Sequence, residues 1–261
     1  MGKKLCTLLL ALVIALAVAG CGGSADTPAA DTPAADTPAA PAANPTAEPT
    51  AEPTEAPKAE AAWEITDSGV KTEVNSIGST WFKAWYLVEN TGDLPLFLNT
   101  VDVDIETESG QMVKKISMMS AYPQVLLPGE TGAYFETGML DNGTETEGLK
   151  LHGRIAPVEA KVDCVRYTVE GAETKADAAY GAKLLGRVVN DTDADTEGMV
   201  YIAALCYDAD GAFLGAMFTI LTDSIPANDY AGFEMTPFGV KIPADAIAET
   251  VVFAYPHQFQ F

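Results

Sequence analysis

The sequence predicts an all-β protein: two tandem antiparallel β-sandwich domains that follow a signal peptide and a disordered linker. From residue 62 onward, short runs rich in Val, Ile, Tyr, Phe and Trp are separated by Gly, Pro, Asn and Asp clusters about every ten residues. Helical periodicity over a dozen residues is scarce. Part of the pattern in 62–156 returns in 157–261, which indicates two domains of about 100 residues each.

The first twenty residues have the three parts of a secretion signal. Lys3 and Lys4 precede an apolar run over 5–20, and small residues lie just before Cys21. A helix made of this run would rise about 24 Å, whereas a bilayer core is spanned by roughly 20 apolar residues. We therefore expect a cleaved signal over 1–20, with an uncleaved membrane helix as the alternative.

The ending Val18-Ala19-Gly20-Cys21 resembles the lipobox of bacterial lipoproteins. In that family the signal is cut before the cysteine, and the cysteine sulfur carries a diacylglycerol. The resemblance implies lipidation of Cys21, the lipid bilayer as a partner through Cys21, and an extracytoplasmic location anchored to the bacterial cell membrane. Two acyl chains give lasting attachment, whereas one binds a membrane only marginally.

Residues 21–61 have the composition of a linker. The sequence Ala-Asp-Thr-Pro-Ala occurs three times over 25–39, and Ala-Glu-Pro-Thr occurs twice over 47–54. Between 22 and 61 there is no aromatic residue, Val, Ile, Leu or Met, so burial cannot offset the entropy of folding. We expect a disordered spacer, biased by its eight prolines towards extended conformations.

Eleven strands are predicted in the folded part. They cover 81–88, 99–107, 112–118, 132–136, 149–154, 161–169, 183–189, 199–207, 212–220, 230–234 and 250–255. The run over 101–106 alternates, with Val101, Val103 and Ile105 on one face and acidic residues on the other. Such alternation predicts a strand with one buried and one wet face.

The two halves can be aligned on each other. Residues 88–91 correspond to 189–192 at a spacing of 101, and the turn at 109–110 corresponds to 210–211 at the same spacing. Residues 127–130 correspond to 225–228 at a spacing of 98. We therefore expect a first sandwich over 62–156 and a second over 157–261, with the border near Pro157.

The second half resembles the FxLYD-type immunoglobulin-like domains of bacterial surface lipoproteins. The resemblance rests on a Gly-x-Val-x-Asn strand over 186–190, the Leu-Cys-Tyr-Asp-Ala-Asp-Gly hairpin over 205–211, and Ile225-Pro226 before Phe233. Ala204 and Cys206 stand where the family has Phe and Leu. The resemblance implies an immunoglobulin-like fold in both halves and no active site, because these family residues maintain the fold.

The chain is strongly acidic, with a formal net charge of −22 at pH 7. Nucleic acids and anionic headgroups need Lys and Arg to neutralise them, so no nucleic-acid partner is expected. Acidic wall polymers would be repelled as well, unless metal ions bridge the two.

Asp191, Asp193 and Asp195 alternate as in the start of a calcium loop. Position six would be Thr196 instead of Gly and position twelve Ile202 instead of Glu, so the segment is not an EF-hand. A weak extracellular calcium site and a solvated acidic loop are the two interpretations, and the acidic loop is favoured.

Catalytic signatures are scarce in the sequence. The chain has two histidines, His152 and His257, each near the end of a predicted strand. The Gly-x-Ser-x-Gly elbow, the His-Glu-x-x-His zinc motif and the Gly-rich phosphate loop do not occur. We expect no enzyme and no cofactor beyond the lipid modification; a hydrolase that uses these histidines is the less favoured alternative.

Cys164 and Cys206 both lie in the predicted second domain. A disulfide across its core is one alternative, which an exported location permits. Two small buried thiols are the other, because free cysteine is among the most buried residue types. The buried thiols are favoured.

Aromatic residues crowd one predicted strand. A two-residue period places Trp81 and Trp85 on one face, and Phe82 and Tyr86 on the other. One face is expected in the core. The other is either an exposed platform of the kind that stacks sugar rings or a surface buried against the neighbouring domain.

These observations lead to one functional hypothesis and one main alternative. We expect a membrane-anchored extracytoplasmic lipoprotein that acts as a noncatalytic interaction or scaffold module for an unknown protein or cell-wall partner. The alternative is a lipoprotein that binds carbohydrate or the cell wall through the aromatic strand.

Overall fold

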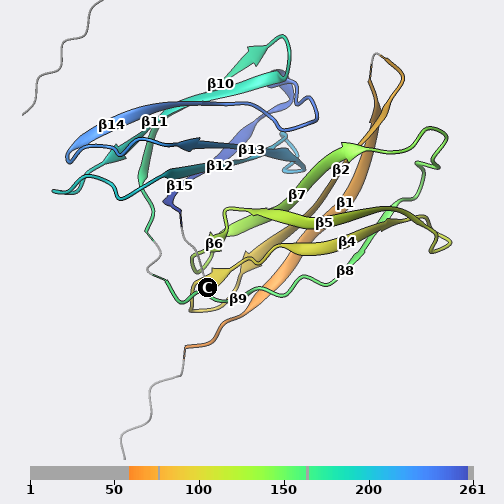
Figure 1. The fold of residues 1–261 in the computed structure, drawn as a ribbon, viewed down its shortest axis with the longest axis horizontal. Helices are drawn as coiled ribbons and strands as arrows, with labels where there is room; N and C mark the ends of the chain where they lie inside the picture. The colour runs from red at the N-terminus through yellow and green to blue at the C-terminus, as the bar shows by residue number, and fades with distance from the viewer. Residues whose placement is uncertain (1–58, 76, 163–164, 258–261) are drawn as a thin grey trace, which may run out of the picture. The chain divides into compact units, whose positions relative to one another are not determined.

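The computed structural model describes residues 59–75, 77–162 and 165–257, all within one compact unit, Glu55–Phe261. The signal, Cys21 and nearly all of the linker predicted from the sequence lie outside the described residues. The described part is all-β with antiparallel strands, which confirms the predicted fold class (Figure 1). A single turn of 3-10 helix, η1 (Ala244–Ala246), interrupts the strands of this part.

The first sandwich consists of two facing three-stranded layers. One layer has the order β1-β2-β7, and the other has the order β5-β4-β8. The bounds are β1 (Trp63–Val74), β2 (Thr80–Asn90), β4 (Val101–Glu106), β5 (Met112–Tyr122), β7 (Thr131–Met139) and β8 (Lys150–Gly153). Strand β5 joins the layers, because its first part pairs with β4 and its end pairs with β7. The change follows Met118, whose φ of 59° turns the strand.

A short third sheet closes one end of this sandwich. It has the order β6-β3-β9 and consists of β3 (Leu96–Phe97), β6 (Val125–Leu126) and β9 (Val158–Glu159). Strand β9 follows the expected domain border near Pro157 but pairs with β3. The first sandwich therefore continues to Glu159, a few residues beyond that border.

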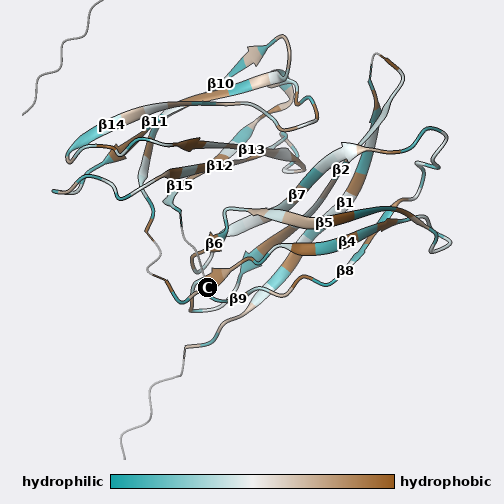
Figure 2. Ribbon diagram, viewed as in Figure 1, coloured by the Kyte–Doolittle hydropathy of each residue, from teal (hydrophilic) through white to brown (hydrophobic). Residues whose placement is uncertain are grey.

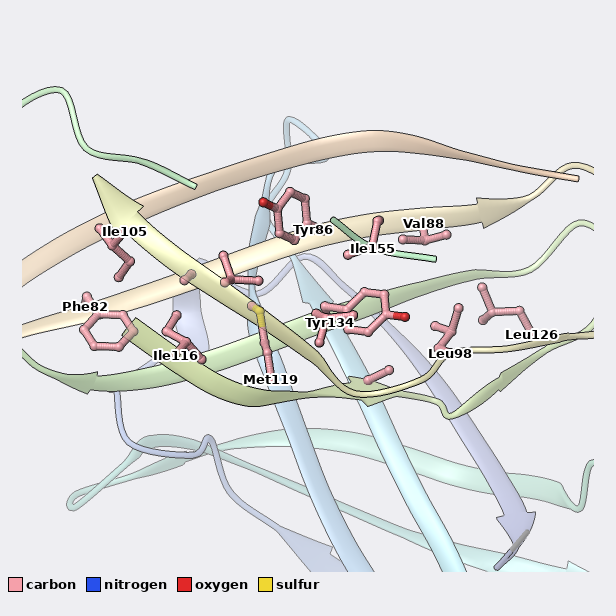
Figure 3. Close-up of a cluster of buried hydrophobic side chains, with 14 of the residues drawn as sticks. Phe82, Tyr86, Val88, Leu98, Ile105, Ile116, Met119, Leu126, Tyr134 and Ile155 are labelled. Atoms are coloured by element: carbon pink, nitrogen blue, oxygen red, sulfur yellow. The ribbon is translucent and has the colours of Figure 1, made fainter. Parts of the chain in front are cut away.

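The core of the first sandwich lies between its two layers (Figure 3). Strand β2 contributes alternate residues, Phe82, Ala84, Tyr86 and Val88, and β4 contributes Val101, Val103 and Ile105. The alternation expected for 101–106 is therefore present. The acidic residues Asp102, Asp104 and Glu106 between them are exposed or half-buried.

The second sandwich repeats this arrangement. One layer has the order β10-β11-β14 and the other β13-β12-β15. The bounds are β10 (Thr168–Asp177), β11 (Gly181–Asn190), β12 (Val200–Tyr207), β13 (Phe213–Leu221), β14 (Asp229–Met235) and β15 (Glu249–Pro256). In both sandwiches the first, second and fifth long strands form one layer, and the third, fourth and sixth form the other. The chain therefore contains a structural repeat.

Two buried asparagines fix the register of this repeat. The side-chain amide Nδ2 of Asn90 donates to the carbonyls of Leu94 (2.9 Å) and Leu126 (3.0 Å). Nδ2 of Asn190 donates in the same way to Ala194 (2.8 Å) and Ile225 (3.0 Å). The spacing at this point is therefore 100, one less than the expected alignment of 88–91 with 189–192.

The two hairpin turns keep the expected spacing of 101. The Gly110 amide donates to the Thr107 carbonyl, and the Gly211 amide donates to the Asp208 carbonyl. Both glycines have a φ near 80°, which only glycine adopts without strain (81° and 79°). The number of residues between equivalent positions of the two sandwiches therefore changes along the repeat, because the connecting loops differ in length.

Two edge strands depart from the sequence expectation. Strand β10 begins at Thr168, where the predicted strand 161–169 ends, and β1 had no predicted counterpart. Both strands pair on one side only, and most of their residues are exposed. Because an exposed edge strand buries few side chains, its sequence does not have to alternate between apolar and polar residues. The sequence pattern that predicts buried strands is therefore missing from β1 and β10.

Candidate functional site

The aromatic strand predicted as a platform is β2, and most of its aromatic side chains are buried. Phe82 and Tyr86 lie in the core of the first sandwich, with 2% and 6% of their surface exposed. Trp85 is on the other face of β2 and is 5% exposed. These three side chains do not form an exposed platform. Phe82 and Tyr86 are inside the core, and the face of β2 that carries Trp85 is covered by the second sandwich.

Trp85 belongs to an apolar cluster that joins the two sandwiches, which we call the interface cluster. Its buried members are Trp85, Leu87, Ala133 and Phe135 from the first sandwich and Ala203, Leu205, Phe213, Ala216, Phe253 and Tyr255 from the second. The Trp85 and Phe213 rings lie 6.0 Å apart, and Phe135 and Phe213 meet edge to face at 5.7 Å. The outer face formed by β2 and β7 therefore packs on the outer face formed by β12, β13 and β15.

The Trp85 ring is also held by its neighbour β1. Its indole Nε1 donates to Asp67 Oδ2 at 2.8 Å, and Lys71 lies over the ring at 5.7 Å. A Cβ on Gly69, which pairs with Trp85, would lie 2.7 Å from the ring carbons. The glycine in β1 therefore provides the space in which the indole lies.

Polar contacts reinforce the interface cluster. Lys83 Nζ donates to the Leu214 carbonyl at 2.8 Å, and burial lowers the pKa of this lysine. Thr137 Oγ1 donates to the Phe238 carbonyl at 3.2 Å. These two bonds run from the first sandwich to the second and hold the backbone of 214 and 238 against it.

Arg166 makes the most extensive of these cross-contacts. It precedes β10, and its guanidinium donates from Nε and Nη2 to the two carboxylate oxygens of Glu130, at 3.1 and 2.6 Å. Nη2 also donates to the Val125 carbonyl at 2.6 Å. The guanidinium lies 5.7 and 5.6 Å from the ring centres of Phe253 and Tyr255. A bidentate pair of this geometry fixes orientation as well as distance.

Trp81 differs from the other aromatic residues of β2 because it lines a cleft. The cleft has a volume of about 620 Å³. One wall comes from the β1–β2 hairpin and consists of Glu73, Val74, Asn75 and Trp81. The other wall comes from the second sandwich and consists of Ala179, Tyr180, Pro243 and residues 239–241. We call it the Trp81–Tyr180 cleft.

The hairpin wall is held by its own hydrogen bonds. Asn75 Oδ1 accepts from the amides of Ile77 (3.1 Å) and Ser79 (2.9 Å), and the Gly78 amide donates to the Asn75 carbonyl (3.0 Å). The side-chain oxygen of Asn75 is thus used within the turn. Its Nδ2 group has no hydrogen bond to another described residue and is available to a ligand.

The opposite wall is equally preformed. Asp177 Oδ1 accepts from the amides of Ala179 (2.8 Å) and Tyr180 (2.9 Å), and these bonds lower the pKa of Asp177. The Ile242 amide donates to the Tyr180 carbonyl at 3.3 Å. Gly181, with φ 83°, permits this approach, because a Cβ there would lie 2.5 Å from the Ile242 carbonyl oxygen.

The Trp81–Tyr180 cleft presents aromatic surface beside polar groups of both kinds. Tyr180 is 49% exposed on its turn. Lys241 supplies a donor, although its Nζ also makes a long 3.4 Å bond to the Ala178 carbonyl, and Glu73 supplies an acceptor. A few polar groups on an aromatic lining are what small-ligand sites generally contain.

Of the two candidate cysteines, Cys206 lies in the described part of the chain. Cys206 is a free thiol with no exposed surface, packed in the core of the second sandwich with Ile202 and Ala204. Burial raises its pKa to about 12. Cys164 lies outside the described residues.

Two of the three candidate calcium residues serve the fold of their own loop. Asp191, Asp193 and Asp195 are exposed, and two of them face the turn at 226–229. Asp195 Oδ1 accepts from the Ala227 amide at 3.0 Å, and Asp193 Oδ1 accepts from Asn228 Nδ2 at 3.4 Å. Within 59–75, 77–162 and 165–257, no group of three or more His, Cys, Asp or Glu side chains is placed to hold a metal ion.

The two histidines belong to different sandwiches. His152 is exposed on β8, where it pairs with Asp104 in the ladder. His257 follows β15 and stacks on Tyr201 with ring centres 4.5 Å apart. Partial burial lowers the pKa of His257. The structure therefore gives His257 a packing role at the end of its sheet.

The lipid attachment expected at Cys21 cannot be placed, because this residue lies outside the described part of the chain. Within that part, none of the helical structure has the length and hydrophobicity needed to span a bilayer.

Comparison with known proteins adds no assignment. The chain matches no protein-family model and no curated protein.

Sequence reasoning missed most of the Trp81–Tyr180 cleft. Trp81 was a candidate, but Asn75, Tyr180 and Lys241 were not. Tyr180 stands alone in a short Ala-Tyr-Gly turn, and it meets Trp81 only because the two sandwiches pack together. An aromatic residue at a turn tip, where polar residues are usual, is the signal that could have indicated it.

Proposed function

We propose that this protein is a membrane-anchored extracytoplasmic lipoprotein whose paired immunoglobulin-like sandwiches act as a noncatalytic binding module. The lipobox resemblance at Cys21 supports the anchor, and the FxLYD resemblance supports the kind of module. The order of strands in each sandwich is compatible with that module, and Asn190, Gly186 and the 208–211 turn serve its fold.

One observation carries the binding role: the Trp81–Tyr180 cleft has walls from both sandwiches, and each wall is preformed by its own hydrogen bonds. Aromatic surface that the two cores do not use is retained at this cleft. A scaffold whose sandwiches served only as spacers would not need it.

The anchor is tested by replacing Cys21. In cells that process lipoproteins, Cys21→Ala should abolish labelling by radioactive palmitate and leave either an unprocessed precursor or a released protein. Unchanged labelling of this variant would contradict lipidation at Cys21.

The binding role is tested by site-specific crosslinking in intact cells. A photoreactive amino acid at position 180 should give a discrete crosslinked product. The same amino acid at position 230, where Tyr230 is 56% exposed on the same sandwich, is the matched control. Equal products at both positions, or none at 180, would contradict a binding role for the Trp81–Tyr180 cleft.

A further inference from the structure

The large concave surfaces of the described residues differ in their chemistry. A pocket of about 410 Å³ at one end of the first sandwich is lined by Glu108, Glu145 and Glu147. A cleft of about 630 Å³ between the sandwiches contains Glu89 and Glu249. Carboxylates dominate the first. The second also contains Glu130 and two aromatic residues, Tyr207 and Phe253, but none of its described lining residues is basic. The Trp81–Tyr180 cleft instead combines two aromatic side chains with groups of opposite charge.

Charge narrows the class of ligand that this cleft suits. The described lining contains one acidic residue, Glu73, and one basic residue, Lys241, so the formal charges of the lining cancel. The chain as a whole carries a formal charge of −22, which disfavours an anionic polymer at any part of its surface. The binding of a neutral ligand avoids both the cost of desolvating a charged group and this electrostatic repulsion.

The lining groups match the two surfaces of a sugar ring. Aromatic rings have an electron-rich face, against which the weakly positive C–H groups of a pyranose can stack. Hydroxyl and acetamido groups at the ring edge both donate and accept hydrogen bonds. Asn75 Nδ2 and Lys241 Nζ can donate to them, and the Glu73 carboxylate can accept.

We propose that the Trp81–Tyr180 cleft binds a neutral oligosaccharide, with sugar rings stacked on Trp81 and Tyr180. This assignment rests on the binding role proposed above and adds the class of ligand. The occupant is a glycan rather than a peptide because the polar groups lie beside the aromatic faces as individual donors and acceptors. A peptide added to the unpaired edge of β1 or β10 would be held by main-chain hydrogen bonds, and it would not need the Trp81 and Tyr180 rings.

The volume and shape of the site agree with a short glycan segment. About 620 Å³ is within the 300–1,000 Å³ typical of small-molecule sites, and the cleft is open at its mouth. Val74 and Ile77, which are 69% and 82% exposed on the β1–β2 hairpin, extend the apolar surface of that wall. A chain of sugars could therefore continue beyond the ring held in the cleft.

The test is a titration of the full chain in detergent micelles with N-acetylglucosamine tetramer and with cellotetraose. Tryptophan fluorescence and calorimetry follow the binding. We expect saturable binding of at least one of these glycans, with a fluorescence change that disappears in Trp81→Ala. Tyr180→Ala should weaken binding about tenfold, whereas Tyr180→Phe should retain it because the ring is kept.

Tyr230→Ala is the matched control and should bind like the unchanged protein. Thermal unfolding of each variant shows whether it is folded, and Tyr180, on an exposed turn, is the substitution least able to disturb the core. Binding by Tyr180→Ala with the affinity of the unchanged protein, or equal binding of an oligogalacturonate, would overturn the assignment.

The two proposals fail in different ways. If neither glycan binds while position 180 still gives a discrete crosslinked product in cells, the binding role stands and the glycan assignment is wrong. If position 180 gives no product and neither glycan binds, both are wrong.

Discussion

At the scale of single residues, two buried asparagines organise the fold. Asn90 and Asn190 end equivalent strands, and each has no exposed surface. The Asn90 amide donates to two carbonyls and the Asn190 amide to three. Each side-chain oxygen also accepts a backbone amide from the residue two positions on, Gly92 or Thr192. One side chain thereby ties a strand end to two loops. This role explains the asparagine of the Gly-x-Val-x-Asn pattern without any reference to function.

Asn190→Ala should lower the free energy of unfolding by about 2–4 kcal/mol, because it removes several hydrogen bonds made by a fully buried side chain. The bonds lost are those to the carbonyls of Ala194, Ile225 and Pro226, each of which keeps one other donor. Urea denaturation measures the change. Asn142→Ala, in an exposed loop, is the control and should change stability by less than about 0.5 kcal/mol. A loss no greater than that of the control would show that water replaces the amide.

Cys206 provides a second test at this scale. With a pKa raised to about 12, the Cys206 thiol stays protonated at pH 8, and burial blocks access as well. Iodoacetamide should therefore leave Cys206 unmodified in the folded protein and modify it fully in urea, as followed by peptide mass spectrometry. Rapid modification of the folded protein would mean that this core opens frequently.

At the scale of strands, hydropathy distinguishes strands with one solvent-exposed face from strands that are buried on both faces. Strand β4 alternates along Val-Asp-Val-Asp-Ile-Glu, whereas β12 is almost continuously apolar over Val-Tyr-Ile-Ala-Ala-Leu-Cys-Tyr (Figure 2). The difference arises because β4 has one wet face and β12 is buried on both. Its even-numbered residues face the core of the second sandwich, and Ala203 and Leu205 face the interface cluster.

This contrast shows what the sequence can and cannot predict. Alternation and turn residues suffice for the buried strands, and the Asp208-Ala-Asp-Gly turn forms as its residues require. The edge strands β1 and β10 are missed because exposure removes their pattern. The Trp81–Tyr180 cleft is missed because Asn75 and Tyr180 are about 100 residues apart and meet through domain packing, which no local pattern encodes.

The turn that carries Tyr180 gives a prediction at the element scale. Asp177→Ala removes the acceptor of the Ala179 and Tyr180 amides, so these two amides should exchange hydrogen faster. Hydrogen exchange resolved by residue measures the effect. Asp208→Ala is the matched control, because Asp208 accepts two amides in a turn away from the cleft. It should leave exchange at 179 and 180 unchanged.

The same turn should respond to pH in one direction. The folded-state pKa of Asp177 is lowered by the bonds from the Tyr180 and Ala179 amides. The ionised Asp177 carboxylate therefore stabilises the folded turn fully at pH values above the usual pKa of 3.8. This stabilisation is lost as the pH falls through the lowered folded-state pKa. Protection of amides 179 and 180 should stay constant from pH 7 to about 5 and decline only in strong acid. A decline near neutral pH would contradict this assignment of the acceptor.

At the scale of the whole described unit, the two sandwiches depend on each other. The layer β1-β2-β7 and the layer β13-β12-β15 both place large apolar side chains on their outer faces. Separated sandwiches would expose Trp85, Leu205 and Phe213 to water, at roughly 1.5–3 kcal/mol for each large side chain. An apolar interface of this kind restricts relative motion of domains, which is otherwise the usual expectation.

The unit should therefore unfold in one calorimetric transition, and Arg166 should contribute to that coupling. Arg166→Ala removes the cation paired with the partly buried Glu130 carboxylate, which keeps the Leu127 amide as a donor, and also removes a donor to the Val125 carbonyl. We therefore expect a loss of about 2–3 kcal/mol. Arg187→Ala is the matched control. It breaks an Arg–Glu pair within the second sandwich whose side chains, Arg187 and Glu170, are 48% and 45% exposed, and such pairs contribute about 0–1 kcal/mol.

Combining Arg166→Ala with Ala203→Glu, which places a charge inside the interface cluster, should split the single transition into two, because each sandwich then unfolds by itself. Two transitions in the unchanged protein, or equal losses for Arg166→Ala and Arg187→Ala, would show that the sandwiches are independent and that the Trp81–Tyr180 cleft is not held rigidly.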